Sequence, residues 1–93
     1  MIEATLFSPK RELFKGRANR ITVSDTNGEM QILQNHAPLL SVLAKGDIVI
    51  EGDSGISQFK ILSGFIEVHD NKAIILAREE HENRLEKSRE TER

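Results

Sequence analysis

Apolar and polar residues alternate in short runs along the first 77 positions, and turn residues separate the runs. A period of two is typical of a half-buried β-strand, whose successive side chains point to opposite faces of a sheet. No helical period of ten residues or more occurs before Ala77. The pattern predicts strands at residues 4–7, 13–14 (with a break at Gly16), 21–23, 30–32, 48–50, 59–61, 66–68 and 72–77.

The residues between these runs favour tight reversals of the chain. Pro9 ends the first strand, because proline lacks the N–H that a ladder needs. Asn27-Gly28 supplies the positive φ angles of a hairpin turn, residues 52–55 form a second hairpin loop, and Asp70-Asn71 forms a third turn. Many short strands joined by such turns predict an all-β fold, either a sandwich or a barrel.

The composition changes sharply near Ala77. Charged residues occupy 17 of the first 77 positions but 11 of the last 16, where Leu85 is the one apolar residue. A segment this polar has no face of its own to bury. We therefore expect one β-sandwich domain at residues 1–77, followed by a charged tail at residues 78–93 that is partly helical or disordered.

The residues that usually carry chemistry are sparse. The chain has no cysteine, and its three histidines lack the paired spacing of a metal site. Neither a phosphate-binding glycine loop nor a nucleophile elbow is present. The net charge of −2 gives no basic footprint for nucleic acid, and no apolar run is long enough to span a membrane. We predict no catalytic residue, metal, cofactor, nucleic-acid partner or membrane insertion.

Residues 28–40 form the most distinctive segment, GEMQILQNHAPLL. After the loop that contains His36 and Pro38, apolar residues follow without clean alternation. They could form a strand buried on both faces, with His36 as a hydrogen-bonded loop residue. They could instead form a surface where apolar side chains and a polar loop meet a partner.

This segment closely resembles the signature of the epsilon subunit of F-type ATP synthases, called delta in mitochondria. The resemblance continues in the family's order through most of residues 1–77. It includes Phe7-Ser8-Pro9, Leu13-Phe14-Lys15-Gly16, Ile21-Thr22-Val23, Lys45-Gly46, Ser63-Gly64-Phe65-Ile66-Glu67-Val68, Asn71-Lys72 and Ile75-Leu76-Ala77. One departure is Leu62-Ser63-Gly64, where the family usually has Ser-Gly-Gly.

The resemblance implies a flattened antiparallel β-sandwich of two roughly five-stranded sheets. It implies a non-catalytic rotor subunit of the central stalk, which contacts the gamma subunit and the c-subunit ring. Such a subunit couples rotation of the ring, driven by ion flux, to ATP synthesis. Its expected location is peripheral, on the cytoplasmic face of the bacterial plasma membrane.

The resemblance also implies two contact surfaces. The first faces the c ring, and its Glu29 is the expected partner of a basic loop residue; it comprises Asn27, Gly28, Glu29 and Met30. Leu40 and Leu43 are expected in the core. The second surface faces gamma and comprises His36, Ala37, Pro38, Leu39 and Ser41.

The family usually adds a C-terminal pair of helices, which can inhibit ATP hydrolysis and in some bacteria binds ATP. Only 16 residues follow Ala77, without the ATP-binding motif. We therefore expect neither an inhibitory arm nor a response to ATP. The alternative function is a free-standing β-sandwich module that binds a protein or peptide by strand addition. A small hydrolase is disfavoured, because no nucleophile–base pattern is present.

Overall fold

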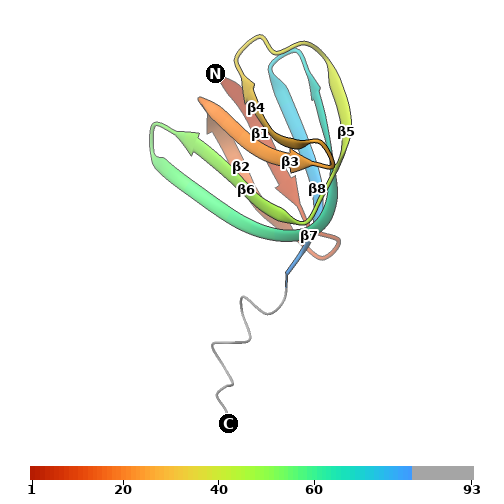
Figure 1. Cartoon of the computed structure of the whole chain (residues 1–93). Coiled ribbons are helices and arrows are strands. Elements are labelled where there is room, and N and C mark those ends of the chain that lie inside the picture. Colours follow the sequence, from red (N-terminus) through yellow and green to blue (C-terminus); the bar gives the residue numbers. More distant parts are fainter. Residues whose placement is uncertain (81–93) are drawn as a thin grey trace.

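The computed structural model describes residues 1–80, which form eight β-strands and no helix (Figure 1). The all-β class predicted from the alternating pattern is confirmed. The strands are β1 (Ile2–Phe7), β2 (Glu12–Ala18), β3 (Arg20–Asp25), β4 (Gly28–Leu33), β5 (Leu39–Leu43), β6 (Gly46–Gly52), β7 (Gly55–His69) and β8 (Lys72–Glu79).

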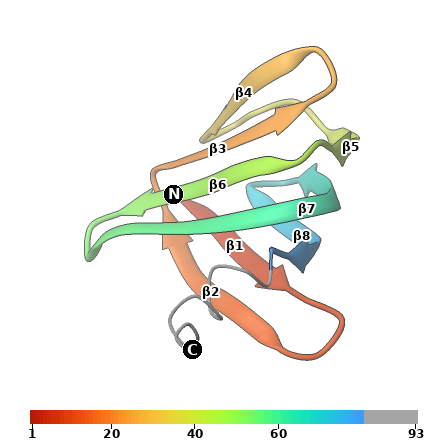
Figure 2. The same cartoon turned by 60° about the horizontal axis from the view of Figure 1, so that its bottom comes forward.

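The strands form two layers that share the long strand β7 (Figure 2). The first half of β7 pairs with β6, and this layer continues through β3 to β4. The second half of β7 pairs with β8 on one side and β5 on the other, and this layer continues from β8 through β1 to β2. One layer therefore has five strands, namely β2, β1, β8, β7 and β5. The other has four, namely β4, β3, β6 and β7, because β7 belongs to both layers. Every pair is antiparallel except β1–β8, which is parallel.

The core between the layers is aliphatic, and no polar or charged residue among those described is buried in it. Alternate positions of each strand supply it, as in Ile66 and Val68 of β7 or Ala73 and Ile75 of β8. The neighbouring strands β7 and β8 approach closely at Gly64, where an added Cβ would lie 2.7 Å from the carbonyl oxygen of Leu76. This closeness explains why β7 carries a glycine just after the register shift between Ile61 and Ser63.

Several strand ends differ from the predicted ones, and the strands predicted at residues 59–61 and 66–68 form one continuous strand, β7. β2 runs through Gly16 to Ala18 without the expected break, because Gly16 pairs with Ala4 of β1. β8 continues past Ala77, since Arg78 pairs with Ser63 and the strand ends at Glu79. The rest of the predicted tail, residues 81–93, lies outside the described residues.

The predicted turns are present, but at Asn27-Gly28 only the glycine has the expected positive φ. Gly28 has φ 124°, and the backbone N–H of Asn27 donates a 2.7 Å hydrogen bond to Asp25 Oδ1. Asp70 and Asn71 both have positive φ, 52° and 59°, as a two-residue hairpin turn requires. Asn and Asp tolerate this conformation better than other non-glycine residues.

Candidate interaction surfaces

The outer face of the five-stranded layer carries a continuous apolar patch. Register places Val42 of β5, Phe65 of β7, Leu76 of β8 and Phe7 of β1 in one row across four strands. Ile74 and Leu40 lie in the next row, on either side of Glu67. Exposed fractions across this apolar face range from 37% for Phe7 to 77% for Leu40. Contiguous exposed apolar patches usually mark interaction sites.

The outer face of the other layer is polar by contrast. Gln31, Thr22, Val49 and Gln58 form a row across its four strands. Beside this row Asp47 accepts a 2.8 Å hydrogen bond from Gln58 Nε2, and its Oδ1 lies 3.4 Å from Lys60 Nζ. The two outer faces are therefore chemically different, and the apolar face is the better suited to a protein partner.

The loop before β5 is held by a pair of asparagines. The backbone N–H of Asn35 donates a 2.6 Å hydrogen bond to Asn71 Oδ1, and Asn71 Nδ2 donates to Asn35 Oδ1 at 3.1 Å. His36 is half-buried, and its Nδ1 lies 2.7 Å from the carbonyl oxygen of Ala37. Ala37 and Pro38 are exposed. We call the two hydrogen bonds between Asn35 and Asn71 the asparagine clasp. The clasp ties this loop to the β7–β8 turn and so fixes where β5 begins.

The orientation of β5 reverses part of the expected gamma-facing surface. Leu39 and Ser41 lie opposite the buried Val68 and Ile66, so they share the inner face, and Leu39 packs against the core. Leu40, expected in the core, is exposed, whereas Leu43 is buried as expected. The interpretation of a strand buried on both faces is thus wrong. The clean alternation is hidden because both faces of β5 carry apolar residues.

The expected ring-facing residues occupy the β3–β4 hairpin. Asn27, Gly28 and Glu29 are exposed at the turn, where a partner can reach them. Met30 differs, because it lies opposite Val23 and packs against the core. The assignment of this hairpin to the c ring stays a prediction.

The described residues hold no cluster of metal ligands. Within residues 1–80 no group of three or more His, Asp or Glu side chains could hold a metal ion. The same residues contain no helix long and apolar enough to cross a membrane. A solvent-open hollow of about 480 Å³ lies at the β1–β2 turn. It brings cations and a carboxylate together and is lined by Ser8, Pro9, Lys10, Arg11, Leu62, Arg78 and Glu79.

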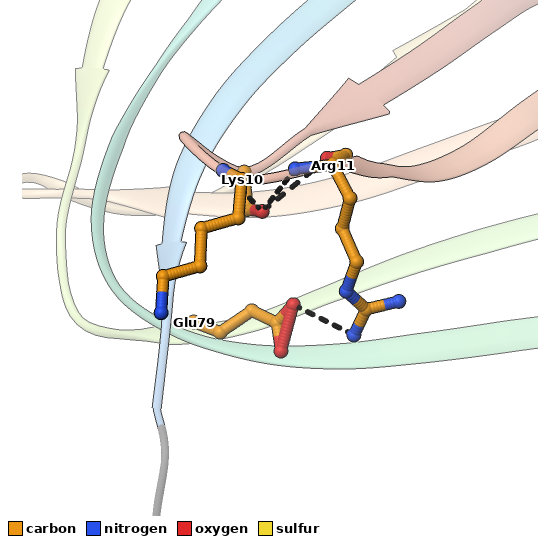
Figure 3. Close-up of polar contacts among 4 residues, drawn as sticks. Lys10, Arg11 and Glu79 are labelled. Carbon is orange, nitrogen blue, oxygen red and sulfur yellow. Dashed lines mark hydrogen bonds and ion pairs between the residues drawn. The ribbon is translucent and has the colours of Figure 1, made fainter.

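Figure 3 shows the polar contacts of this hollow. Arg11 Nη2 lies 3.2 Å from Glu79 Oε2, so the β1–β2 turn is joined to the end of β8. The Ser8 hydroxyl accepts hydrogen bonds from the backbone N–H groups of Lys10, at 3.2 Å, and Arg11, at 3.1 Å. None of the site residues predicted from the sequence lines this hollow.

The sequence contains one overlooked signal for the apolar face. Phe65-Ile66 and Ile74-Ile75-Leu76 are consecutive apolar residues within strands. Since neighbours in a strand point to opposite faces, such pairs indicate that both faces are apolar. The hollow has no comparable signal, because its residues lie far apart in the sequence.

Comparisons with known proteins agree on one family. The family model described as ATP synthase, Delta/Epsilon chain, beta-sandwich domain matches residues 1–82. The ATP synthase epsilon chain of Chlorobaculum tepidum is 37% identical over 75 residues, which cover 80% of this chain and 85% of that one. The epsilon chain of Hyphomonas neptunium is 40% identical over 76 residues, covering 81% of this chain and 56% of that one.

Solved structures of ATP synthases contain similar chains. One from the Euglena gracilis mitochondrial ATP synthase, in an OSCP/F1/c-ring structure, has a TM-score of 0.77 and 28% identity, covering 96% of this chain and 64% of that one. One from the central stalk/c-ring structure of the Tetrahymena thermophila enzyme has a TM-score of 0.70 and 27% identity, covering 84% of this chain and 63% of that one. This chain thus spans less than two thirds of these two chains and of the H. neptunium relative.

A β-sandwich with one extended apolar outer face has the surface of a protein-interaction domain. The match over residues 1–82 specifies it further: the chain belongs to the delta/epsilon chain family of ATP synthases. It is an epsilon-type central-stalk subunit and not an enzyme in its own right. Similar chains come from bacteria and from chloroplasts.

Proposed function

We propose that this chain transmits rotation between the c-subunit ring and the gamma subunit, and so couples ion flux to ATP synthesis. The observation that carries this proposal is the apolar face on one outer surface of the sandwich. A torque-transmitting subunit needs two contact surfaces on a stiff body. The fully apolar core and the continuous strand β7, which joins both layers, provide that stiffness.

The apolar face is the proposed contact for gamma. Leu40 and Val42 of β5 and Phe65 of β7 are its most exposed side chains. They replace Leu39 and Ser41, which point inward, while Ala37 and Pro38 extend the surface at the loop before β5. Burying one large apolar side chain contributes about 1.5–3 kcal/mol, so several together support a stable contact.

The β3–β4 turn is the proposed contact for the c ring. Asn27 and Glu29 are exposed there, and the Asn27–Asp25 hydrogen bond holds the turn in one conformation. Glu29 is the residue proposed to pair with a basic side chain of the ring loops. The proposed location of the subunit is peripheral, on the cytoplasmic face of a bacterial plasma membrane, and no nucleic-acid partner is proposed.

Leu40→Asp tests the gamma contact. Because Leu40 is already 77% exposed, the variant should fold normally but lose most of its binding to gamma in a reconstituted stalk. Ile56→Asp is the matched control, since Ile56 is 70% exposed but lies on the other layer. Co-purification with gamma measures binding, and thermal unfolding measures folding. Unchanged binding of a folded Leu40→Asp variant would refute a gamma contact through this face, whereas failure of the original chain to bind gamma would favour a free-standing binding module.

A further inference from the structure

Positive charge is concentrated in one short segment of this acidic chain. The net charge is −2, yet residues 10–20 hold five cations and a single carboxylate. All six of these side chains are exposed, and the segment comprises the end of the β1–β2 turn, strand β2 and the first residue of β3. They are Lys10, Arg11, Glu12, Lys15, Arg17 and Arg20.

The first part of this segment lies along an open edge of the sandwich. β2 is the end strand of the five-stranded layer, and its backbone pairs with β1 along one side. The end of β2 is covered by β6, because the N–H of Asn19 donates a 2.6 Å hydrogen bond to the carbonyl oxygen of Glu51 and Gly52 lies against the carbonyl oxygen of Arg17. The open part of the edge is therefore residues 12–16. Figure 2 shows β2 at the outer margin of this layer. An end strand presents backbone N–H and C=O groups that can pair with a further strand.

Three of the five cations have no ion pair within residues 1–80. Arg11 is compensated by Glu79, and Arg20 Nε lies 3.7 Å from Glu51 Oε2. Lys10, Lys15 and Arg17 make no such contact with the described residues. Lys15 and Arg17 are two positions apart, so they lie on the same face of β2, opposite Thr5 and Glu3 of β1.

The cations of β2, Lys15 and Arg17, are followed toward the β1–β2 turn by Lys10 and Arg11, which line the hollow there. The Ser8 hydrogen bonds hold this turn, and Figure 3 shows that Lys10 and Arg11 extend from it toward the side where Glu79 lies. Arg78 also lines the hollow. Among the described residues that line the hollow, three are cations and one, Glu79, is a carboxylate.

We propose that the β2 edge binds an extended acidic segment of another polypeptide, which adds to the layer as a further strand. Its carboxylates, at alternating positions, pair with Lys15 and Arg17, and one at its end reaches Lys10 in the hollow. A second copy of this chain does not fit, because pairing two β2 edges would bring their cations together. A polypeptide fits better than a lipid surface, since it alone supplies backbone groups to the open edge. The proposal does not depend on the contact with gamma.

The probe is a five-residue peptide of alternating Glu and Thr with blocked ends, matched to residues 12–16 of β2, which β6 leaves open. Added to the full chain, it should shift the NMR signals of β2 and slow amide hydrogen exchange there. Lys15→Glu combined with Arg17→Glu should weaken binding about tenfold or more, because two attractions become repulsions. Lys45→Glu makes the same kind of charge change on an exposed loop away from β2, and it should leave binding within about twofold.

A peptide N-methylated at alternate residues separates strand addition from simple charge attraction. It keeps every carboxylate but cannot donate hydrogen bonds along one side, so its binding should be lost. Equal binding of the methylated peptide would overturn strand addition. Binding of phosphatidylglycerol vesicles through Lys15 and Arg17, with none of the peptide, would assign the edge to lipid. If neither probe binds, the proposal is wrong, and the cations would serve only to prevent edge-to-edge pairing between copies of the chain.

Discussion

Replacing Gly64 by alanine should destabilise the sandwich, because β7 and β8 approach too closely there for a side chain. An added Cβ would lie 2.7 Å from the carbonyl oxygen of Leu76 and 3.2 Å from Cα and Cβ of Ala77. These are mainly backbone atoms of a paired strand, so they cannot move aside without disturbing the ladder. Gly64 has no positive φ, so the cost comes from this contact and not from backbone strain.

The expected size follows from two opposing effects. Overpacking a well-packed interior costs about 1–3 kcal/mol. Replacing glycine within a strand recovers about 0.5–1 kcal/mol, since alanine has less freedom to lose. We therefore expect a net loss of about 1–2 kcal/mol, which lowers the unfolding temperature of a domain this size by roughly 5–15 °C.

Urea and thermal unfolding of Gly64→Ala and Gly16→Ala measure this difference. Gly16 is the matched control, because a Cβ there would meet only the ring of Phe14, at 3.4 Å. The control should be neutral, or stabilised by up to about 1 kcal/mol. If both variants unfold at the same denaturant concentration as the original chain, the inference that the close approach of β7 and β8 requires glycine is refuted.

Three further predictions test the orientation of β5, the asparagine clasp and the polar outer face. Leu39→Asp should lower the free energy of unfolding in urea by about 2–3 kcal/mol, because Leu39 packs on the core. Leu40→Asp should change it by less than about 0.5 kcal/mol, because Leu40 is exposed. A larger loss for Leu40→Asp than for Leu39→Asp would contradict the pairing of β5 with β7. Asn71→Ala should cost about 1–2 kcal/mol, since it loses the bonds to Asn35 and places alanine at positive φ, and Asn71→Gly should cost less in the same thermal assay; equal losses would show that φ is unimportant. Asp47→Ala should change the free energy of unfolding by less than about 1 kcal/mol, because its contacts to Gln58 and Lys60 are exposed, and a larger loss would mean that they matter to the fold.

The two outer faces of the sandwich suit different surroundings. The apolar face has the character of a protein-interaction surface. The opposite face carries exposed polar and paired charged groups such as Asp47 and Lys60. This asymmetry supports one large docking contact instead of binding on both sides. It also makes Ile56 a suitable control position, because an exposed apolar residue on the polar side is isolated from the patch.

Most strands and turns could be predicted from the sequence, because they depend on local chemistry. Ile66 and Val68 alternate with Glu67 and His69, and both are buried as the pattern predicts. Asn27-Gly28 and Asp70-Asn71 are turns, because few other residues adopt positive φ easily. The family, too, was evident from the sequence, since the segment at residues 28–40 is specific in order and spacing.

Only the tertiary structure decided which face of β5 is buried and which residues come together. Leu39 and Leu40 are the same residue type at adjacent positions, so the local pattern cannot say which one points inward. The answer comes from pairing with β7, where Leu39 lies opposite the buried Val68. The apolar face and the basic hollow likewise combine residues from strands far apart in sequence. A period of two defines two faces for each strand, but only packing against the rest of the chain determines which one meets solvent.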